Sequence, residues 1–171
     1  MSSIERIAIV GAGLAAARAA EALRKEGFEG SIKMFGDEPE RPYLRPPLSK
    51  EYLRGETDRD QVFVHPATFY DEQRIDFRPA TRVRSIEPGS REVVLESEER
   101  LPYDRLLIAT GARPRTLPIP YSDLPGVMTL RTLDDADAIR AAAIDAARIV
   151  VIGAGWIGSE VAASLRMVGR S

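Results

Sequence analysis

One short pattern occurs twice in this chain and limits the folds that the sequence can adopt. Residues 7–13 read IAIVGAG and residues 149–155 read IVVIGAG. Each copy is an apolar run rich in β-branched residues, typical of a buried strand, and each ends in a glycine turn. A helix-like stretch rich in small residues follows each copy, at 14–25 and 156–167. The copies lie about 140 residues apart, too far for a solenoid repeat, which indicates two nucleotide-binding units in one larger protein.

Composition excludes several kinds of chemistry. The 171 residues include 24 basic and 26 acidic side chains, so a net charge of −2 gives no reason to expect a nucleic-acid partner. The absence of cysteine excludes dithiol redox chemistry, thiolate catalysis and cysteine-based iron–sulfur or zinc ligation. The single histidine, His65, cannot build a metal site alone, so no metal is expected. No apolar run approaches the roughly 18 to 20 residues of a membrane span, and no signal peptide is visible, so we expect a cytoplasmic protein without a membrane partner.

The segment between the two copies predicts a mixture of strands, short helices and proline-rich loops. Prolines mark 39–47 as a loop and 112–126 as an extended connection. Ser49 is a candidate cap for the short helix that follows it. The expected strands are at 31–35, 75–78, 82–86, 92–96 and 104–109, and the expected helices at 50–54, 67–73 and 134–147.

The first glycine turn has the pattern of a dinucleotide-binding loop. It reads G-x-G-x-x-A from Gly11 to Ala16, after a strand and at the start of a helix. Gly11 allows the tight turn, Gly13 lets a pyrophosphate approach the backbone, and the small Ala16 allows close packing of helix and strand. Backbone amides at the helix start would then face the phosphates. The alternative, a plain tight turn without a ligand, is less favoured in this context.

Two acidic residues follow the second expected strand at the position where such a unit holds the ribose hydroxyl groups. They are Asp37 and Glu38, and the alternative interpretation is a solvated pair in a loop.

The second glycine motif, Gly153 to Gly158, reads G-x-G-x-x-G and would hold a second pyrophosphate by the same geometry. Its βαβ unit needs a returning strand, and none is visible before Ser171. We therefore expect a fragment of a longer protein, without strong binding of a second nucleotide.

Two dinucleotide motifs in one chain suggest hydride transfer between a flavin and a nicotinamide dinucleotide. The segment 42–50 (PYLRPPLSK) resembles the signature loop of the flavoprotein ferredoxin reductases. The segment 104–113 (DRLLIATGAR), with its A-T-G turn, and the segments 130–132 (LRT) and 155–160 (GWIGSE) resemble later motifs of the same family. The resemblance extends over the whole chain in order.

The resemblance implies an α/β fold with three parts. Residues 1–115 would form a Rossmann-like FAD-binding domain with a parallel sheet and a small antiparallel β insertion. Residues 116–147 would form a connecting segment and helix, and 148–171 would form the first β-α unit of an incomplete NAD(P)-binding domain. The residues implied to bind FAD are Gly11, Gly13, Leu14, Ala15, Asp37, Glu38, Arg45, Lys50, Val83, Ala109, Thr110, Gly111 and Arg131, and those of the second nucleotide loop are Gly153, Gly155 and Gly158.

Lys50 and Glu160 match a family pair that meets near the flavin ring, and they are the candidate catalytic residues. A lysine at the flavin edge stabilises negative charge on the reduced ring, and a carboxylate holds that lysine in place. Taken without the motifs, a solvent-exposed lysine and an exposed helix residue would be the favoured interpretation. Arginines 78, 82 and 84 suggest a surface for an acidic ferredoxin, although a solvated strand face is favoured.

The resemblance implies an enzyme that passes electrons from NAD(P)H through FAD to a ferredoxin-type iron–sulfur protein. The absence of cysteine agrees with one-electron delivery to a separate partner and disfavours the oxidase and peroxidase relatives, which use a cysteine. Two alternatives stay open. The chain is a truncated, catalytically inert fragment that binds FAD weakly or not at all, or it is part of another flavoprotein such as a nitrite reductase subunit.

Overall fold

The computed structural model describes residues 4–170. Its internal contacts divide the chain into two units. Unit 1 comprises residues 4–43 and Phe63–Gly111, and unit 2 comprises Leu44–Val62 and residues 112–170. Each unit is described by itself below.

Unit 1 is built on a parallel sheet of four strands in the order β3-β2-β1-β7. The α1 helix (Leu14–Lys25) follows β1, and the short α3 helix (Phe69–Glu72) precedes β3. The register places Ile7 of β1 between Ile32 of β2 and Arg105 of β7. The strands are β1 (Arg6–Val10), β2 (Ser31–Phe35), β3 (Ile75–Arg78) and β7 (Arg105–Ile108).

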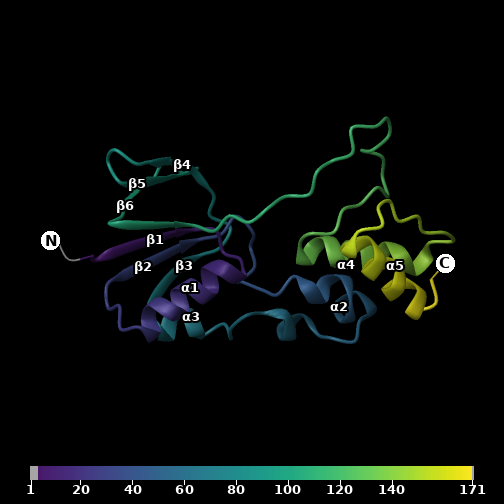
Figure 1. The fold of residues 1–171 in the computed structure, drawn as a ribbon, viewed down its shortest axis with the longest axis horizontal. Coiled ribbons are helices and arrows are strands. Elements are labelled where there is room, and N and C mark those ends of the chain that lie inside the picture. The colour runs from purple at the N-terminus through teal and green to yellow at the C-terminus, as the bar shows by residue number, and fades with distance from the viewer. Residues whose placement is uncertain (1–3, 171) are drawn as a thin grey trace. The chain divides into compact units, whose positions relative to one another are not determined.

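A second sheet of unit 1 is antiparallel, with the order β4-β5-β6. It consists of β4 (Val83–Glu87), β5 (Glu92–Leu95) and β6 (Arg100–Pro102). In Figure 1 it lies on one side of the parallel sheet, and α1 and α3 lie on the other. Side chains of β1 alternate accordingly: Ala8 and Val10 join the cluster with Val93 of β5, whereas Ile9 joins the cluster beneath α1. Full burial of a side chain such as Ile9 contributes about 1.5–3 kcal/mol.

The regular elements described in unit 2 are helices, joined by long irregular segments (Figure 1). Its elements are η1 (Pro46–Ser49), α2 (Glu51–Arg54), η2 (Arg59–Val62), α4 (Leu133–Asp145) and α5 (Trp156–Met167). Leu53 of α2 packs with Ala143 of α4 and with Val161 and Leu165 of α5 in one buried cluster. The four-residue α2 is too short to be stable alone, so its helical form depends on this packing.

The predicted fold class is confirmed, since the chain is α/β with a parallel sheet and a small antiparallel sheet. The expected strands and helices up to α4 are present within one or two residues of their predicted ends. The sequence did not predict β6, because three residues are too few to show a clear alternation.

Two local predictions were wrong. The run 149–152 forms no strand, because no other described segment pairs with it, and Val150 and Ile152 remain 76% and 70% exposed. Ser49 does not cap the helix after it: it ends η1, Lys50 occupies the cap position, and no side-chain cap bond is formed there. The hydroxyl group of Ser49 instead reaches Glu160, 111 residues along the chain.

Residues 4–170 contain neither a membrane-spanning helix nor a cluster of metal-ligating side chains. Every helix there is too short or too polar to cross a membrane. The same residues contain no group of three or more histidine, aspartate or glutamate side chains placed to share a metal ion.

Candidate functional site

The first glycine loop lies at the carboxyl edge of the parallel sheet, where β1, β2 and β7 all end. Gly11 has φ +108°, a conformation that residues with a side chain rarely adopt. Its amide donates to the carbonyl of Phe35 at 2.8 Å, and Ala109 donates to the carbonyl of Val10 at 2.7 Å. A Cβ on Gly11 would lie 2.2 Å from the carbonyl oxygen of Ala109. Position 11 therefore accepts only glycine.

Gly13 plays a different part in the same loop. It stands at the cap position of α1 with φ −87° and ψ −172°, and no side chain caps the helix. A Cβ built on Gly13 would meet no protein atom within 4 Å, so the space before the helix start is open. Leu14 and Ala15 in the first turn are exposed, whereas Ala16 is fully buried against the sheet. The 12-residue helix thus presents its first backbone N–H groups, and the positive end of its dipole, to an open space that suits a pyrophosphate.

The two acidic residues after β2, Asp37 and Glu38, differ in their exposure to solvent. Gly36 packs so closely on the loop that an added Cβ would lie 2.7 Å from the Cβ of Ala12. Glu38 is half-buried, and its carboxylate accepts a hydrogen bond from the hydroxyl group of Tyr43. Asp37 is exposed. Of the two candidates for the ribose hydroxyl groups, Asp37 is therefore the more accessible.

The other predicted FAD residues of unit 1 belong to β4 and to the segment after β7. Val83 opens β4 opposite Leu95 and packs against the cluster under the antiparallel sheet. Ala109 is half-buried beside Gly11, and Thr110 and Gly111 follow it on the surface. The backbone of Ala109 and Thr110 thus lies closely against Gly11.

In unit 2 the structure brings Arg45 and Arg131 together. A guanidinium N–H of Arg45 donates to the carbonyl oxygen of Arg131. A capping box fixes the start of α4: Thr132 accepts from the amide of Asp135 at 3.1 Å, and the Asp135 carboxylate accepts from the amides of Thr132 and Arg131, both at 2.8 Å. The Nε atom of Arg131 is buried and has no hydrogen-bond partner among the described residues. An unsatisfied guanidinium donor of this kind fits an anionic ligand such as a pyrophosphate.

Lys50 and Glu160 form an ion pair in unit 2. The Nζ atom of Lys50 lies 2.9 Å from Oε2 of Glu160, and it also donates to the carbonyl of Pro46 at 3.0 Å. The Lys50 and Glu160 side chains are 38% and 28% exposed, so water screens the pair partly. Hydrogen bonds from Ser49 and then from Lys50 hold the pKa of Glu160 below its ordinary value. Glu160 is therefore ionised at neutral pH.

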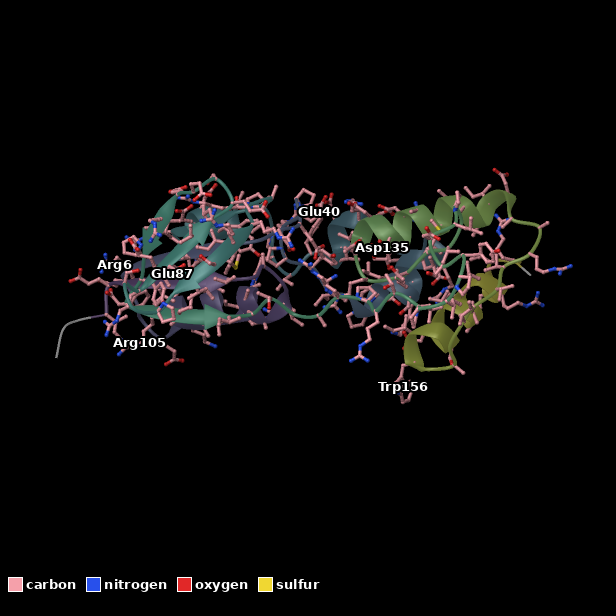
Figure 2. The ribbon with its side chains drawn as sticks, turned by 90° about the horizontal axis from the view of Figure 1, so that it is seen from above. Arg6, Glu40, Glu87, Arg105, Asp135 and Trp156 are labelled. Atoms are coloured by element: carbon pink, nitrogen blue, oxygen red, sulfur yellow. The ribbon has the colours of Figure 1, made fainter. Side chains whose placement is uncertain are left out.

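The second glycine loop repeats the backbone of the first. Gly153 has φ +106°, against +108° at Gly11, and Gly155 is extended at the cap of α5, as Gly13 is at the cap of α1. Added Cβ atoms on Gly153 or Gly155 would meet nothing within 4 Å, but one on Gly158 would lie 2.1 Å from the carbonyl oxygen of Gly153. Beside this loop, the Trp156 side chain points away from α5 and is 88% exposed (Figure 2).

The predicted site residues thus fall into separate groups. Unit 1 contains Gly11, Gly13, Leu14, Ala15, Asp37, Glu38, Val83, Ala109, Thr110 and Gly111. Unit 2 contains Arg45, Lys50, Arg131, Gly153, Gly155, Gly158 and Glu160. Within their units, the loop meets the A-T-G turn, Arg45 meets Arg131, and Lys50 meets Glu160. These groups are chemically suited to a dinucleotide.

Comparison with known proteins identifies the family. The model of the pyridine nucleotide-disulphide oxidoreductase family matches residues 5–171.

The chain belongs to the pyridine nucleotide-disulphide oxidoreductase family.

Two of the relatives are named as reductases of rhodocoxin and of putidaredoxin. The chain is 44% identical to rhodocoxin reductase of Rhodococcus erythropolis over 95% of its own length and 38% of that protein. It is 40% identical to putidaredoxin reductase of Pseudomonas putida over 96% of its length and 40% of that protein. A crystal structure of the covalent putidaredoxin reductase–putidaredoxin complex matches 99% of the chain and 41% of the solved chain, with a TM-score of 0.91 and 38% identity. The chain thus spans about 40% of the length of the relatives it matches.

Several contacts near the candidate site were not predictable from the sequence. Ser49 and Ser164 each bond to a residue more than 100 positions away in the sequence, which no local pattern marks. The T-x-x-D spacing at Thr132 and Asp135 is a recognisable capping-box signal, and it would have predicted how the neighbouring Arg131 is held.

The suggested arginine surface for a ferredoxin is neutralised by neighbouring carboxylates. Arg78 pairs with Asp76 and Glu99 at 3.1 Å. Arg82 lies 3.5 Å from Glu96, and Arg84 pairs with Glu98. The favoured interpretation, a solvated strand face, agrees with this geometry.

Proposed function

We propose that this chain is the FAD-binding part of an NAD(P)H-dependent ferredoxin reductase, which passes electrons from NAD(P)H through FAD to a ferredoxin-type iron–sulfur protein. The observation that carries the proposal is the open helix start at Gly13, in a chain whose relatives are named as reductases of ferredoxin, rhodocoxin and putidaredoxin. Because the chain spans about 40% of those relatives, the complete activity is proposed for a reductase that contains it. The absence of cysteine agrees with an electron acceptor on a separate protein.

The glycine loop would hold the pyrophosphate of FAD. The backbone N–H groups at Gly13, Leu14 and Ala15 would donate to it, and Gly11 would set the turn that exposes them. Asp37, with Glu38 beside it, would accept from the ribose hydroxyl groups. The other proposed contacts are the guanidinium groups of Arg45 and Arg131 and the residues Val83, Ala109, Thr110 and Gly111.

Lys50 and Glu160 are the proposed catalytic pair. Bound FAD supplies the chemistry, since it accepts a hydride from NAD(P)H and releases single electrons. The ammonium group of Lys50 would provide positive charge at the flavin edge. Glu160, ionised and 2.9 Å away, would hold that ammonium group in place. Such a fixed charge needs no rearrangement when negative charge develops beside it.

The remaining assignments follow from the same proposal. Gly153, Gly155 and Gly158 would hold the pyrophosphate of NAD(P)H. We assign residues 1–115 to the FAD domain, 116–147 to the connection and 148–171 to the start of the NAD(P) domain, and place the protein in the cytoplasm.

A fluorescence titration of FAD tests the proposal on the 171-residue chain. A Gly13→Ala variant adds a methyl group that meets no protein atom but occupies the space of the pyrophosphate. Gly89→Ala is the matched control, because its Cβ also meets nothing within 4 Å and it lies in the turn between β4 and β5. Circular dichroism confirms that both variants fold.

We expect saturable FAD binding by the unchanged chain and by Gly89→Ala. Binding by Gly13→Ala should be weaker by tenfold or more, which corresponds to about 1.4 kcal/mol. Equal affinity in all three would contradict the proposed site. No binding by the unchanged chain would favour the alternative of a catalytically inert fragment.

A further inference from the structure

Ser49 is a buried polar residue beside the Lys50–Glu160 pair. It is 4% exposed, and its hydroxyl group lies 2.5 Å from Oε2 of Glu160. The same carboxylate oxygen accepts from Lys50 at 2.9 Å. A second acceptor, the carbonyl of Pro46, is 3.4 Å from the Ser49 hydroxyl group, so the single hydroxyl hydrogen is directed to Glu160. Two consecutive residues thus donate to one oxygen atom.

The local chain geometry makes this double contact possible. Ser49 ends η1 and Glu51 begins α2, and Lys50 between them has the non-helical angles φ −125° and ψ −117°. This interruption lets neighbouring side chains reach the same carboxylate, which a continuous helix would not allow, since its successive side chains point in different directions.

The main chain of Ser49 is held by the same helix that carries Glu160. Ser164, one turn further along α5, is 2% exposed and donates to the carbonyl of Ser49 at 2.7 Å. Arg54 of α2 in turn donates to the hydroxyl oxygen of Ser164 at 3.2 Å. Residues 160 and 164 share one face of α5, because they are four positions apart. The helix therefore contacts Ser49 at two points, its hydroxyl group and its carbonyl group.

We propose that Ser49 is a positioning residue for the Lys50–Glu160 pair: its hydroxyl group fixes the Glu160 carboxylate in the orientation that accepts the ammonium group of Lys50. The pair is partly exposed, and an exposed ion pair alone is weak and free to rearrange. The buried hydroxyl group removes that freedom on the carboxylate side. The importance of the pair for a flavin rests on the proposed function, but the arrangement of the three side chains does not.

The charge state of Glu160 gives a direct readout of this contact. A hydroxyl group that donates to a carboxylate favours the ionised form, and Ser49 is the largest cause of the lowered pKa of Glu160. The second cause is Lys50. Loss of either donor should therefore raise this pKa, whereas a general loosening of the packing that keeps both donors should leave it unchanged.

The test is a carbon-13 NMR titration of the Glu160 side-chain carboxyl group in the 171-residue chain, without any flavin. The signal is assigned by its loss in Glu160→Gln. The variants are Ser49→Ala and Lys50→Met, with Ser164→Ala as the matched control. Ser164→Ala also deletes a buried hydroxyl group at this contact, but that group does not touch the carboxylate.

The proposal predicts that the pKa of Glu160 rises in Ser49→Ala and in Lys50→Met and changes by less than either in Ser164→Ala, which leaves both donors to the carboxylate in place. An unchanged pKa in Ser49→Ala would overturn it, and so would an equal rise in Ser164→Ala. Since the titration contains no FAD, its result is independent of the FAD titration. Failure of the proposed function and failure of the role of Ser49 are thus distinguishable.

Discussion

Asp104 holds Arg6, the first residue of β1, through its main chain and its side chain together. One carboxylate oxygen accepts from the amide of Arg6 at 2.8 Å and from that of Glu5 at 3.0 Å, and the other lies 2.9 Å from the Arg6 guanidinium group. Asp104 directly precedes β7, so this contact fixes the register of β7 on β1. That register in turn places the carbonyl of Ala109 against Gly11, where the proposed pyrophosphate loop begins.

This contact predicts a loss of stability in acid. The guanidinium group of Arg6 and the two amides lower the pKa of Asp104 from 3.8 to about 2. Because the folded state lowers this pKa, the stabilisation is complete above about pH 4 and disappears as the pH falls towards 2. Urea unfolding is measured at pH 5, 3 and 2. As the pH falls, the free energy of unfolding should decrease less for Asp104→Asn than for the original chain. The same decrease in variant and original chain would contradict the assignment.

The surroundings of His65 predict a second pH dependence of the stability of the fold, in a higher pH range than that of Asp104. Its ring stacks on Phe69 at 3.8 Å, and its Nε2 lies 3.5 Å from the Glu21 carboxylate. Burial lowers the pKa of His65 below 6.5; Arg18 lowers it further and Glu21 opposes the shift. A histidine held neutral stabilises the fold fully above pH 6.5 and less as the pH falls through its lowered pKa. His65→Phe keeps the stacking on Phe69. Between pH 7 and 5 its free energy of unfolding should depend less on pH than that of the original chain. An equally steep dependence on pH would argue against this role of His65.

Gly158 is predicted to be intolerant of even a methyl group. Alanine in a helix gains about 1 kcal/mol over glycine. At Gly158, however, the new Cβ would lie 2.1 Å from the carbonyl oxygen of Gly153. The loop or the helix must then move, so Gly158→Ala should lower the free energy of unfolding by about 1–3 kcal/mol. Denaturant unfolding measures the effect, with Gly89→Ala as an unhindered control; a stabilised Gly158→Ala would refute the close contact.

Lys50 is predicted to tune the flavin more than the fold. Its ion pair with Glu160 is partly exposed, so Lys50→Met should change the free energy of unfolding by only about 0–1 kcal/mol. In the FAD-loaded chain, loss of the positive charge should lower the reduction potential of the flavin by on the order of 30 mV, equivalent to about 1.4 kcal/mol for two electrons. Lys25→Met, at an exposed position at the end of α1, is the control. Equal potentials in the two variants would exclude Lys50 from the flavin edge.

The features that the sequence predicted well are those encoded by neighbouring residues. The Gly11 loop was recognisable because strand, turn and helix signals follow one another within 20 residues. The β1 strand was recognisable for the same reason, since a buried strand appears as a continuous apolar run.

Features that depend on distant partners were not predictable. The run 149–152 has the composition of a strand, but a strand also requires a paired neighbour, and none is present among the described residues. Ser49 has the local context of a helix cap, yet its hydroxyl group bonds to Glu160. The pairing of Arg45 with the carbonyl of Arg131 joins positions 86 residues apart, which no local pattern encodes.

The central claim is that these residues form the flavin site of a ferredoxin reductase, and a visible absorption spectrum tests it most directly. The purified 171-residue chain is mixed with FAD, separated from free cofactor by gel filtration, and its spectrum is recorded. The account predicts a flavin band that elutes with the protein and is lost in Gly13→Ala. Protein without any flavin absorption, from a chain that is folded by circular dichroism, would contradict the claim.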